Sequence, residues 1–337
     1  MNLLKENIED FSEVLPYRQK EIKLVTNMPT NSGGGRYARE ISRQLDLPLV
    51  DSQDEIKFPM MKRTLNSYFH YPNIKFEADL IHATNQFLAK VADKNPAIVT
   101  VLDMYAFKNL KALPFPTNLI IKRIEKSLSN AEMIIAISKF TKRELEERGI
   151  SVPCEVVYLG ASDHYRQIER KYARAVLGFH IKSDLKSDDK ILLSIGNEND
   201  ERKNIGKIME VFRHLKGWKI IRLGEQEKEY PNLINIMNLP ENFMPFLYSS
   251  VDVFLNLEKE AGFGLTILEA MSCGTPSVCS KTGSFPELNP SVLVDAANSP
   301  EKIAEDVERM YGRTAVLKDK FTWEECAEKH KKIYEEI

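Results

Sequence analysis

Short apolar segments alternate with amphipathic segments along most of the chain. The apolar runs are bounded by polar turns, as is typical of buried parallel strands. The amphipathic segments repeat apolar residues three or four positions apart, as is typical of helices. The first part of the chain predicts strands at 22–27, 79–83, 97–102, 133–137 and 156–160. The second part predicts strands at 191–196, 218–223, 235–239, 251–257, 277–279 and 292–294.

Strands and helices alternate in both parts of the chain, after a polar lead-in at 1–20 whose apolar positions fit one side of a helix. This order predicts an α/β fold with two doubly wound, Rossmann-like domains. In such sheets, ligands bind at the carboxyl ends of the strands. We therefore expect a site in the cleft between the domains.

Charge and cysteine content exclude several classes of protein. The 47 Lys and Arg residues nearly balance the 49 Asp and Glu residues, and the net charge of −2 does not indicate a nucleic-acid surface. The four cysteines form no CxxC pair and are expected to be reduced thiols in a cytoplasmic protein. No run of 18 apolar residues predicts a membrane span. The expected helix at 118–128 carries Lys122, Arg123 and Lys126, which leaves weak peripheral contact with the cytoplasmic face of a membrane as a hypothesis.

The stretch 257–275 carries the most specific signal. An apolar strand leads into the small-residue turn 261–264, and a helix begins near Leu265 with Glu269 in its first turns. A strand, a glycine turn and a helix N-terminus together point backbone N–H groups at an anion. A carboxylate within the helix accepts hydrogen bonds from sugar hydroxyls. We therefore expect a phosphate and a sugar to bind here.

This stretch resembles the donor-site motif of the retaining glycosyltransferases of family 4, which have the GT-B fold. The matching residues are Gly262, Phe263, Gly264, Leu265, Glu269, Ala270, Met271, Cys273, Gly274, Thr275 and Pro276. Glu269 stands at the second Glu of the family pattern. The position of the first Glu is Ala261, and Glu260 or Glu258 is the nearest carboxylate that would replace it.

Three further segments resemble the same family. Gly34 and Gly35 lie in a glycine-rich turn after the first strand, where relatives line the cleft. Asp103 keeps the acidic end of a Thr-Val-His-Asp segment, although its His position is Leu102. Lys203 matches a lysine that holds the nucleotide diphosphate in relatives. The accompanying arginine position is Asn197, and Arg202 is the nearby cation.

The resemblance implies a domain organisation. The N-terminal domain, on the acceptor side, is expected at 1–164, and the C-terminal domain, on the donor side, at 165–318. The final helix, within 319–337, is expected to pack back on the first domain.

The resemblance also implies transfer of a sugar from a nucleoside diphosphate sugar to a hydroxyl acceptor, a glycan, lipid or glycoprotein precursor, with retention of configuration. Glu269 would bind the ribose, and the N–H groups from Phe263 to Thr266 would hold the diphosphate or the sugar. Lys203 would offset the charge of the leaving group, and Asp103 and Glu260 complete the catalytic candidates. Neither an essential metal nor a cofactor besides the donor substrate is expected.

Two alternatives stay open because of the departures at Ala261, Asn197 and Leu102. One is a non-catalytic GT-B protein that binds a nucleotide or glycan and serves as a scaffold. The other is a sugar-nucleotide epimerase, although such enzymes carry more acid–base residues than this sequence shows. Whether the donor sugar is hydrolysed without an acceptor would separate an enzyme from a binding protein.

Overall fold

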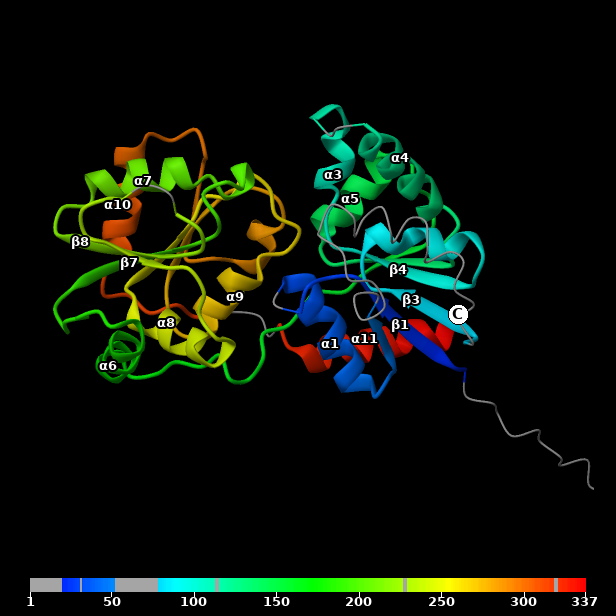
Figure 1. Cartoon of the computed structure of the whole chain (residues 1–337), viewed down its shortest axis with the longest axis horizontal. Coiled ribbons are helices and arrows are strands. Elements are labelled where there is room, and N and C mark those ends of the chain that lie inside the picture. Colours follow the sequence, from blue (N-terminus) through cyan, green and yellow to red (C-terminus); the bar gives the residue numbers. More distant parts are fainter. Residues whose placement is uncertain (1–19, 31, 52–77, 113–114, 227–228, 318–320) are drawn as a thin grey trace, which may run out of the picture.

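The computed structural model describes residues 20–30, 32–51, 78–112, 115–226, 229–317 and 321–337, and within them it contains two parallel sheets of six strands each (Figure 1). The first sheet has the order β2-β1-β3-β4-β5-β6. Its strands are β1 (Ile22–Thr26), β2 (Leu49–Asp51), β3 (Leu80–Ala83), β4 (Ala97–Val101), β5 (Met133–Ala136) and β6 (Cys154–Val156). The second sheet has the order β12-β11-β10-β7-β8-β9. Its strands are β7 (Lys190–Ile195), β8 (Trp218–Leu223), β9 (Leu233–Ile236), β10 (Val253–Asn256), β11 (Ser277–Ser280) and β12 (Val292–Val294).

Helices cover both faces of each sheet (Figure 1). The first domain contains α1 (Gly33–Leu45), α3 (Tyr105–Lys108), α4 (Thr117–Leu128) and α5 (Lys139–Glu147), with the 3-10 turns η2 (Gln86–Asp93) and η3 (Leu110–Ala112). The second contains α6 (Arg170–Ile181), α7 (Ile205–His214), α8 (Met244–Ser250), α9 (Leu265–Ser272) and α10 (Pro300–Met310), with η4 (Glu201–Lys203), η5 (Glu241–Phe243) and η6 (Phe285–Leu288). The last helix, α11 (Trp323–Glu336), packs against α1 on the first sheet. The domain boundaries at 164 and 318 stay predictions.

Successive side chains of the buried strands point alternately into the cores on the two faces of each sheet. Ala97, Val99 and Val101 of β4 pack with α4 and η2, whereas Ile98 packs with α1 on the opposite face. In the second domain, α7 and α10 cover one face of the sheet, and α6, α8 and α9 cover the other (Figure 1). The predicted fold, two doubly wound α/β domains, is confirmed.

The pattern of apolar residues located most strands to within a few positions. It missed β2, a half-buried edge strand of three residues that is too short to show a period. The strand expected at 156–160 is wrong beyond Val156, where β6 ends. The expected helix in 1–20 lies outside the described residues except for its last position. None of the described helices has the length and the apolar content that a membrane crossing requires.

A buried polar network joins α11 to the first sheet. The Tyr37 hydroxyl lies 2.7 Å from both Thr100 Oγ1 and His330 Nε2. His82 bonds Thr100 through Nε2 at 2.7 Å and the Tyr334 hydroxyl through Nδ1 at 2.6 Å. Because burial disfavours the imidazolium form, the pKa of His82 lies well below its usual value and that of His330 falls to about 4. His82 is therefore a satisfied core residue.

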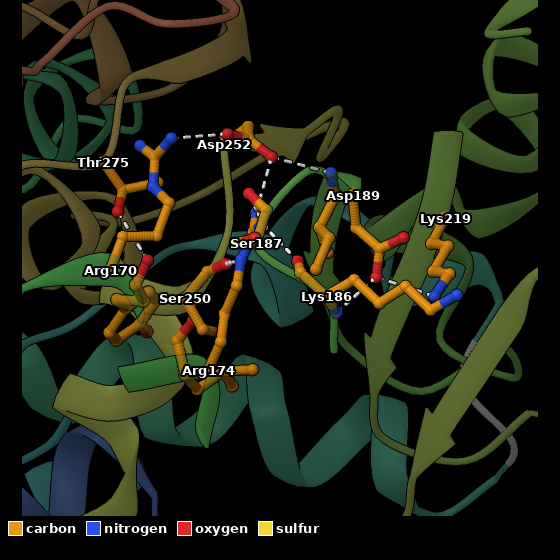
Figure 2. Close-up of polar contacts among 12 residues, drawn as sticks. Arg170, Arg174, Lys186, Ser187, Asp189, Lys219, Ser250, Asp252 and Thr275 are labelled. Atoms are coloured by element: carbon orange, nitrogen blue, oxygen red, sulfur yellow. Dashed lines mark hydrogen bonds and ion pairs between the residues drawn. The ribbon is translucent and has the colours of Figure 1, made fainter. Parts of the chain in front are cut away.

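A second polar cluster fixes α6 to the second sheet, at the amino ends of β7 and β10 (Figure 2). The buried Arg174 guanidinium donates to the carbonyls of Ser250, Lys186 and Ser187, at 2.8, 2.7 and 2.9 Å, and to Asp252 Oδ2 at 3.0 Å. Asp252 also accepts from the Ile191 amide at 2.8 Å. This cluster holds the end of the sheet that lies away from the cleft.

The buried histidines make stability depend on pH. Their pKa values in the folded chain lie below the unfolded value of about 6.5, so the unfolded chain binds more protons between that value and about 4. Stability is fully present above pH 6.5 and falls as the pH drops toward 4, with a contribution from His330 of about 3 kcal/mol. Urea unfolding at pH 7.5, 6 and 5 should show a smaller acid loss for His330→Gln than for the unmodified protein. An exposed-site control, His214→Gln, should keep the original loss, and an equal loss in all three proteins would contradict this account.

The Asp252 cluster should dominate the stability of the second domain. Asp252→Asn leaves the buried Arg174 without its counter-ion, and removing one partner of a buried pair costs about 3 kcal/mol. The matched control is Asp189→Asn, which removes the carboxylate that pairs with Lys219. This pair, drawn beside the Asp252 cluster in Figure 2, is more exposed, so the change should cost about 1 kcal/mol or less. Equal urea midpoints for the two variants would rule out the assigned role of Asp252.

Candidate functional site

Two adjoining cavities lie between the domains at the carboxyl ends of the strands. The smaller, of about 300 Å³, is bounded by the turns after β1 and β4 on one side and by η4 and the 258–266 loop on the other. The larger, of about 670 Å³, runs along α1, α9 and the turn before η5. Both linings include Gly33, Leu265 and Thr266. The cavities therefore meet where α1 and α9 begin.

The N-termini of α1 and α9 face each other at this junction. Gly33 lies close to Leu265, since a Cβ on the glycine would sit 3.4 Å from Leu265 Cδ1. The first N–H groups of a helix have no acceptor within it and carry the positive end of its dipole. Ser32 caps α1 by accepting from the Gly35 amide at 3.1 Å, which leaves the Gly33 and Gly34 amides at the opening. The junction is suited to an anion held from both sides.

Geometry requires two glycines in the 258–266 loop. Gly264 begins α9 with a φ of 104°, a left-handed conformation that side chains rarely adopt. A Cβ on Gly262 would lie 1.9 Å from the Leu102 carbonyl oxygen of the first domain. The loop thus approaches the other domain backbone to backbone.

Glu269 is the most strongly perturbed carboxylate of the site. It is 1% exposed and forms part of the wall of the larger cavity. The Tyr248 hydroxyl donates to its Oε2 at 2.8 Å, and Arg36 of α1 forms an ion pair with its Oε1. Burial raises the pKa of Glu269 to about 7 despite the opposing charge of Arg36.

The predicted cations line the smaller cavity and are already paired. Lys203 Nζ lies 2.6 Å from Glu258 Oε1. Arg202 pairs with Asp200 at 2.8 Å, and its guanidinium lies 5.1 Å from the centre of the Tyr105 ring. Both cations therefore already have a carboxylate partner before any ligand enters.

Asp103 and Glu260 also line the smaller cavity. Asp103 accepts from the Tyr105 amide at 3.1 Å, and burial raises its pKa. Glu260 Oε2 lies 2.6 Å from Lys108 Nζ of the first domain, and Lys108 also pairs with Glu144. The second oxygen, Glu260 Oε1, is buried and has no hydrogen-bond partner among the described residues.

Two predicted residues lie outside both linings. The Asn197 side chain accepts from the Glu225 amide at 3.0 Å and so connects the turn after β7 to the turn after β8. Gly35 packs against the Pro29 carbonyl, whereas its neighbour Gly34 faces the smaller cavity.

Sequence reasoning missed several residues of the site. They are Arg36, Lys108, Tyr165, Glu241 and Tyr248. Only Arg36 had a sequence signal, because it directly follows the glycine run at the start of a predicted helix.

Glu287 of the second domain caps a helix of the first. Its carboxylate accepts from the Lys139 and Phe140 amides at the start of α5, at 2.9 and 2.8 Å, and from the Tyr158 hydroxyl at 2.8 Å. Glu287 thus acts as a helix cap across the domain boundary. Glu260, Glu269 and Glu287 thus each join the two domains.

Residues 189–313 match the family model of the glycosyl transferases group 1. The O-antigen chain mannosyltransferase B of Escherichia coli is 26% identical over 245 residues, which are 61% of this chain and 61% of that protein. The chain therefore spans about three fifths of the length of this curated relative.

Two solved structures share the fold. HepE of Anabaena, in complex with UDP-glucose, has a TM-score of 0.73 at 14% identity, over 95% of this chain and 100% of that one. A sucrose-phosphate synthase from Thermosynechococcus elongatus has a TM-score of 0.71 at 16% identity, over 94% of this chain and 99% of that one. The chain has the GT-B fold of these structures, and the match to the glycosyl transferases group 1 model is confined to residues 189–313. Membership of family 4 and the roles of the site residues stay predictions.

Glu287→Ala should loosen the contact between the domains. The change removes three hydrogen bonds to one carboxylate, and a single hydrogen bond to a charged group contributes about 1.5–3 kcal/mol. Small-angle X-ray scattering should show a larger radius of gyration for the variant, while each domain should melt as it does in the unmodified protein. The control, Glu301→Ala, removes an exposed carboxylate within the second domain and should leave the radius unchanged. An unchanged radius for Glu287→Ala would argue against its role in closure.

Proposed function

We propose that this protein is a retaining, metal-independent glycosyltransferase that moves a sugar from a nucleoside diphosphate sugar to a hydroxyl group of a glycan, lipid or glycoprotein precursor. One observation carries the proposal: two helix N-termini from different domains meet between two adjoining cavities, with the buried Glu269 in the wall of one. A ligand with a nucleoside, a central diphosphate and a terminal sugar matches this sequence of environments.

The donor would lie along the cleft from the larger cavity to the smaller. The nucleoside would occupy the larger cavity with its ribose at Glu269. The diphosphate would accept hydrogen bonds from the amides at Gly33, Gly34, Leu265 and Thr266, because those groups meet at the junction. The similarity to HepE, which was solved with UDP-glucose, and to an O-antigen mannosyltransferase supports a nucleotide-sugar donor.

The terminal sugar would then lie beside Glu260 and Asp103. The unpartnered Glu260 Oε1 is a hydrogen-bond acceptor in a cavity wall, and a sugar hydroxyl would satisfy it. This supports Glu260 as the carboxylate that takes over from the Glu missing at Ala261. Glu258 is the weaker candidate, since it is already paired with Lys203.

The reaction would proceed on one face of the sugar. The bond between the anomeric carbon and the phosphate oxygen breaks, and its electron pair stays on that oxygen. The acceptor oxygen forms the new bond to the anomeric carbon, and its proton passes to the departing phosphate. Lys203 and the two helix N-termini stabilise the charge that develops there, which is the physical basis for expecting no metal.

The acceptor side also carries a surface that suits an anionic membrane. Lys122, Arg123 and Lys126 lie on α4, and Phe115 and Leu119 near its start are 81% and 41% exposed. Exposed apolar side chains beside cations favour weak peripheral binding. We include such contact, at the cytoplasmic face, in the proposal.

A binding scaffold is the second candidate. It is favoured by Leu102 in place of a His and by the Asn197 side chain, which bonds the Glu225 amide instead of facing the cleft. Retention through the leaving phosphate needs no protein base, so the loss of that His is compatible with catalysis.

Lys203→Ala and Glu269→Gln should each weaken UDP or GDP binding about ten- to a hundredfold, because each removes a charge-assisted hydrogen bond of about 1.5–3 kcal/mol. The affinities can be measured by calorimetry and compared with melting shifts, since a ligand that binds only the folded state raises its melting temperature. Lys216→Ala, an exposed cation outside both cavities, is the matched control for charge.

Unchanged affinity in both site variants would defeat the site assignment. Nucleotide binding without hydrolysis of any common donor sugar would favour the scaffold over the enzyme.

A further inference from the structure

Arg36 crosses the cleft at the level of the proposed ribose site. It stands in the first turn of α1, directly after the glycine run, and its side chain is 20% exposed. Its Nη1 pairs with Glu269 Oε1 and lies 3.3 Å from the Tyr165 hydroxyl, and its Nη2 lies 3.4 Å from Glu241 Oε2. The first domain thus supplies the cation for a carboxylate of the second.

The two oxygens of Glu269 are held by different domains. Tyr248, from α8 of the second domain, donates to Oε2, and Arg36 donates to Oε1. A carboxylate buried without a cation becomes neutral, since desolvation disfavours its charged form. Burial already raises the pKa of Glu269 to about 7, and Arg36 is the largest opposing influence. Without Arg36, Glu269 would be protonated over a wider pH range.

We propose that Arg36 is a positioning residue for the donor: it keeps Glu269 ionised and oriented, so that the carboxylate accepts hydrogen bonds from both ribose hydroxyls. The proposal rests on the proposed function, in which Glu269 binds the ribose. An ionised carboxylate has about four lone-pair sites. Tyr248 and Arg36 occupy one on each oxygen. The sites that remain match the two vicinal hydroxyls of a ribose.

The surroundings of Arg36 favour this role over direct binding of the diphosphate. Tyr165 accepts from the same Nη1 that pairs with Glu269, Glu241 lies beside Nη2, and the Tyr165 hydroxyl itself donates to Glu241. If Arg36 moved to a phosphate, it would leave a fully buried carboxylate without a counter-ion, which costs several kcal/mol. Arg36 therefore acts on the donor through Glu269.

The test compares ribonucleotides with analogues that lack the hydroxyls. UDP, GDP and their 2′,3′-dideoxy forms would be titrated by calorimetry at pH 8 into the unmodified chain, Arg36→Met, Arg36→Lys and Glu269→Gln. Arg43→Met is the matched control, because Arg43 lies on the same helix but outside both cavities, where it pairs with Glu40. The readout is the dissociation constant of the dideoxy form divided by that of the ribonucleotide. A general loss of structure does not change this ratio.

We expect the ratio to fall about tenfold in Arg36→Met, because the ribose loses charge assistance while the dideoxy form loses nothing. Arg36→Lys should restore part of the ratio, Glu269→Gln should lower it at least as far, and Arg43→Met should leave it unchanged. Combining Arg36→Met with Glu269→Gln should give no further fall, since the two residues act as one unit.

Three outcomes would overturn the inference. Equal weakening of both nucleotide forms in Arg36→Met would mean that Arg36 contacts the diphosphate. A lowered ratio in Glu269→Gln with an unchanged ratio in Arg36→Met would retain the ribose site and remove Arg36 from it. Failure of the unmodified chain to bind any nucleoside diphosphate would instead defeat the proposed function and this inference with it.

Discussion

The arrangement of the cleft depends on a buried carboxylate that one domain supplies and the other neutralises. Glu269 is almost inaccessible, and its cation, Arg36, is 233 positions away in the sequence. Glu260 with Lys108 and Glu287 with the start of α5 repeat the pattern, a carboxylate of the second domain facing donors of the first. Contacts of this polar kind between domains exchange with solvent and ligands more readily than a hydrophobic interface does. The cleft is thus held by groups that a polar ligand can also use.

The opposite ends of the strands are built differently. At the amino ends of β7 and β10, Arg174 and Asp252 bond each other, and Arg174 also bonds three surrounding carbonyls. At the carboxyl ends, glycine turns, helix N-termini and partly accessible cations leave hydrogen-bonding capacity unused. A site on parallel strands requires a rigid scaffold at one end and hydrogen-bond donors that still lack partners at the other, because the ligand must find donors that are already positioned.

Sequence reasoning reached the parts of this design that are local. Apolar runs located the strands, and the Gly262–Glu269 spacing located the glycine turn that begins α9, since each depends on neighbouring residues. It did not reach the Arg36–Glu269 pair, because nothing in a single sequence specifies which helices meet across a cleft. It assigned Asn197 to the donor by its position in a motif, whereas the side chain bonds the Glu225 amide. Motif position fixes the backbone of a site better than it fixes where a side chain points.

The same distinction bears on Ala261, the most serious departure from the family pattern. The 258–266 loop approaches the first domain so closely at Gly262 that a side chain there would collide with the Leu102 carbonyl. One residue before Ala261, Glu260 reaches Lys108 with one oxygen and leaves the other unsatisfied in the cavity wall. A carboxylate at this place is thus positioned by the first domain instead of by its own loop. If the donor sugar binds Glu260, that contact forms only when the two domains meet. The change from the family's Glu to Ala261 would then make sugar binding depend on domain closure and would still leave a carboxylate for the sugar.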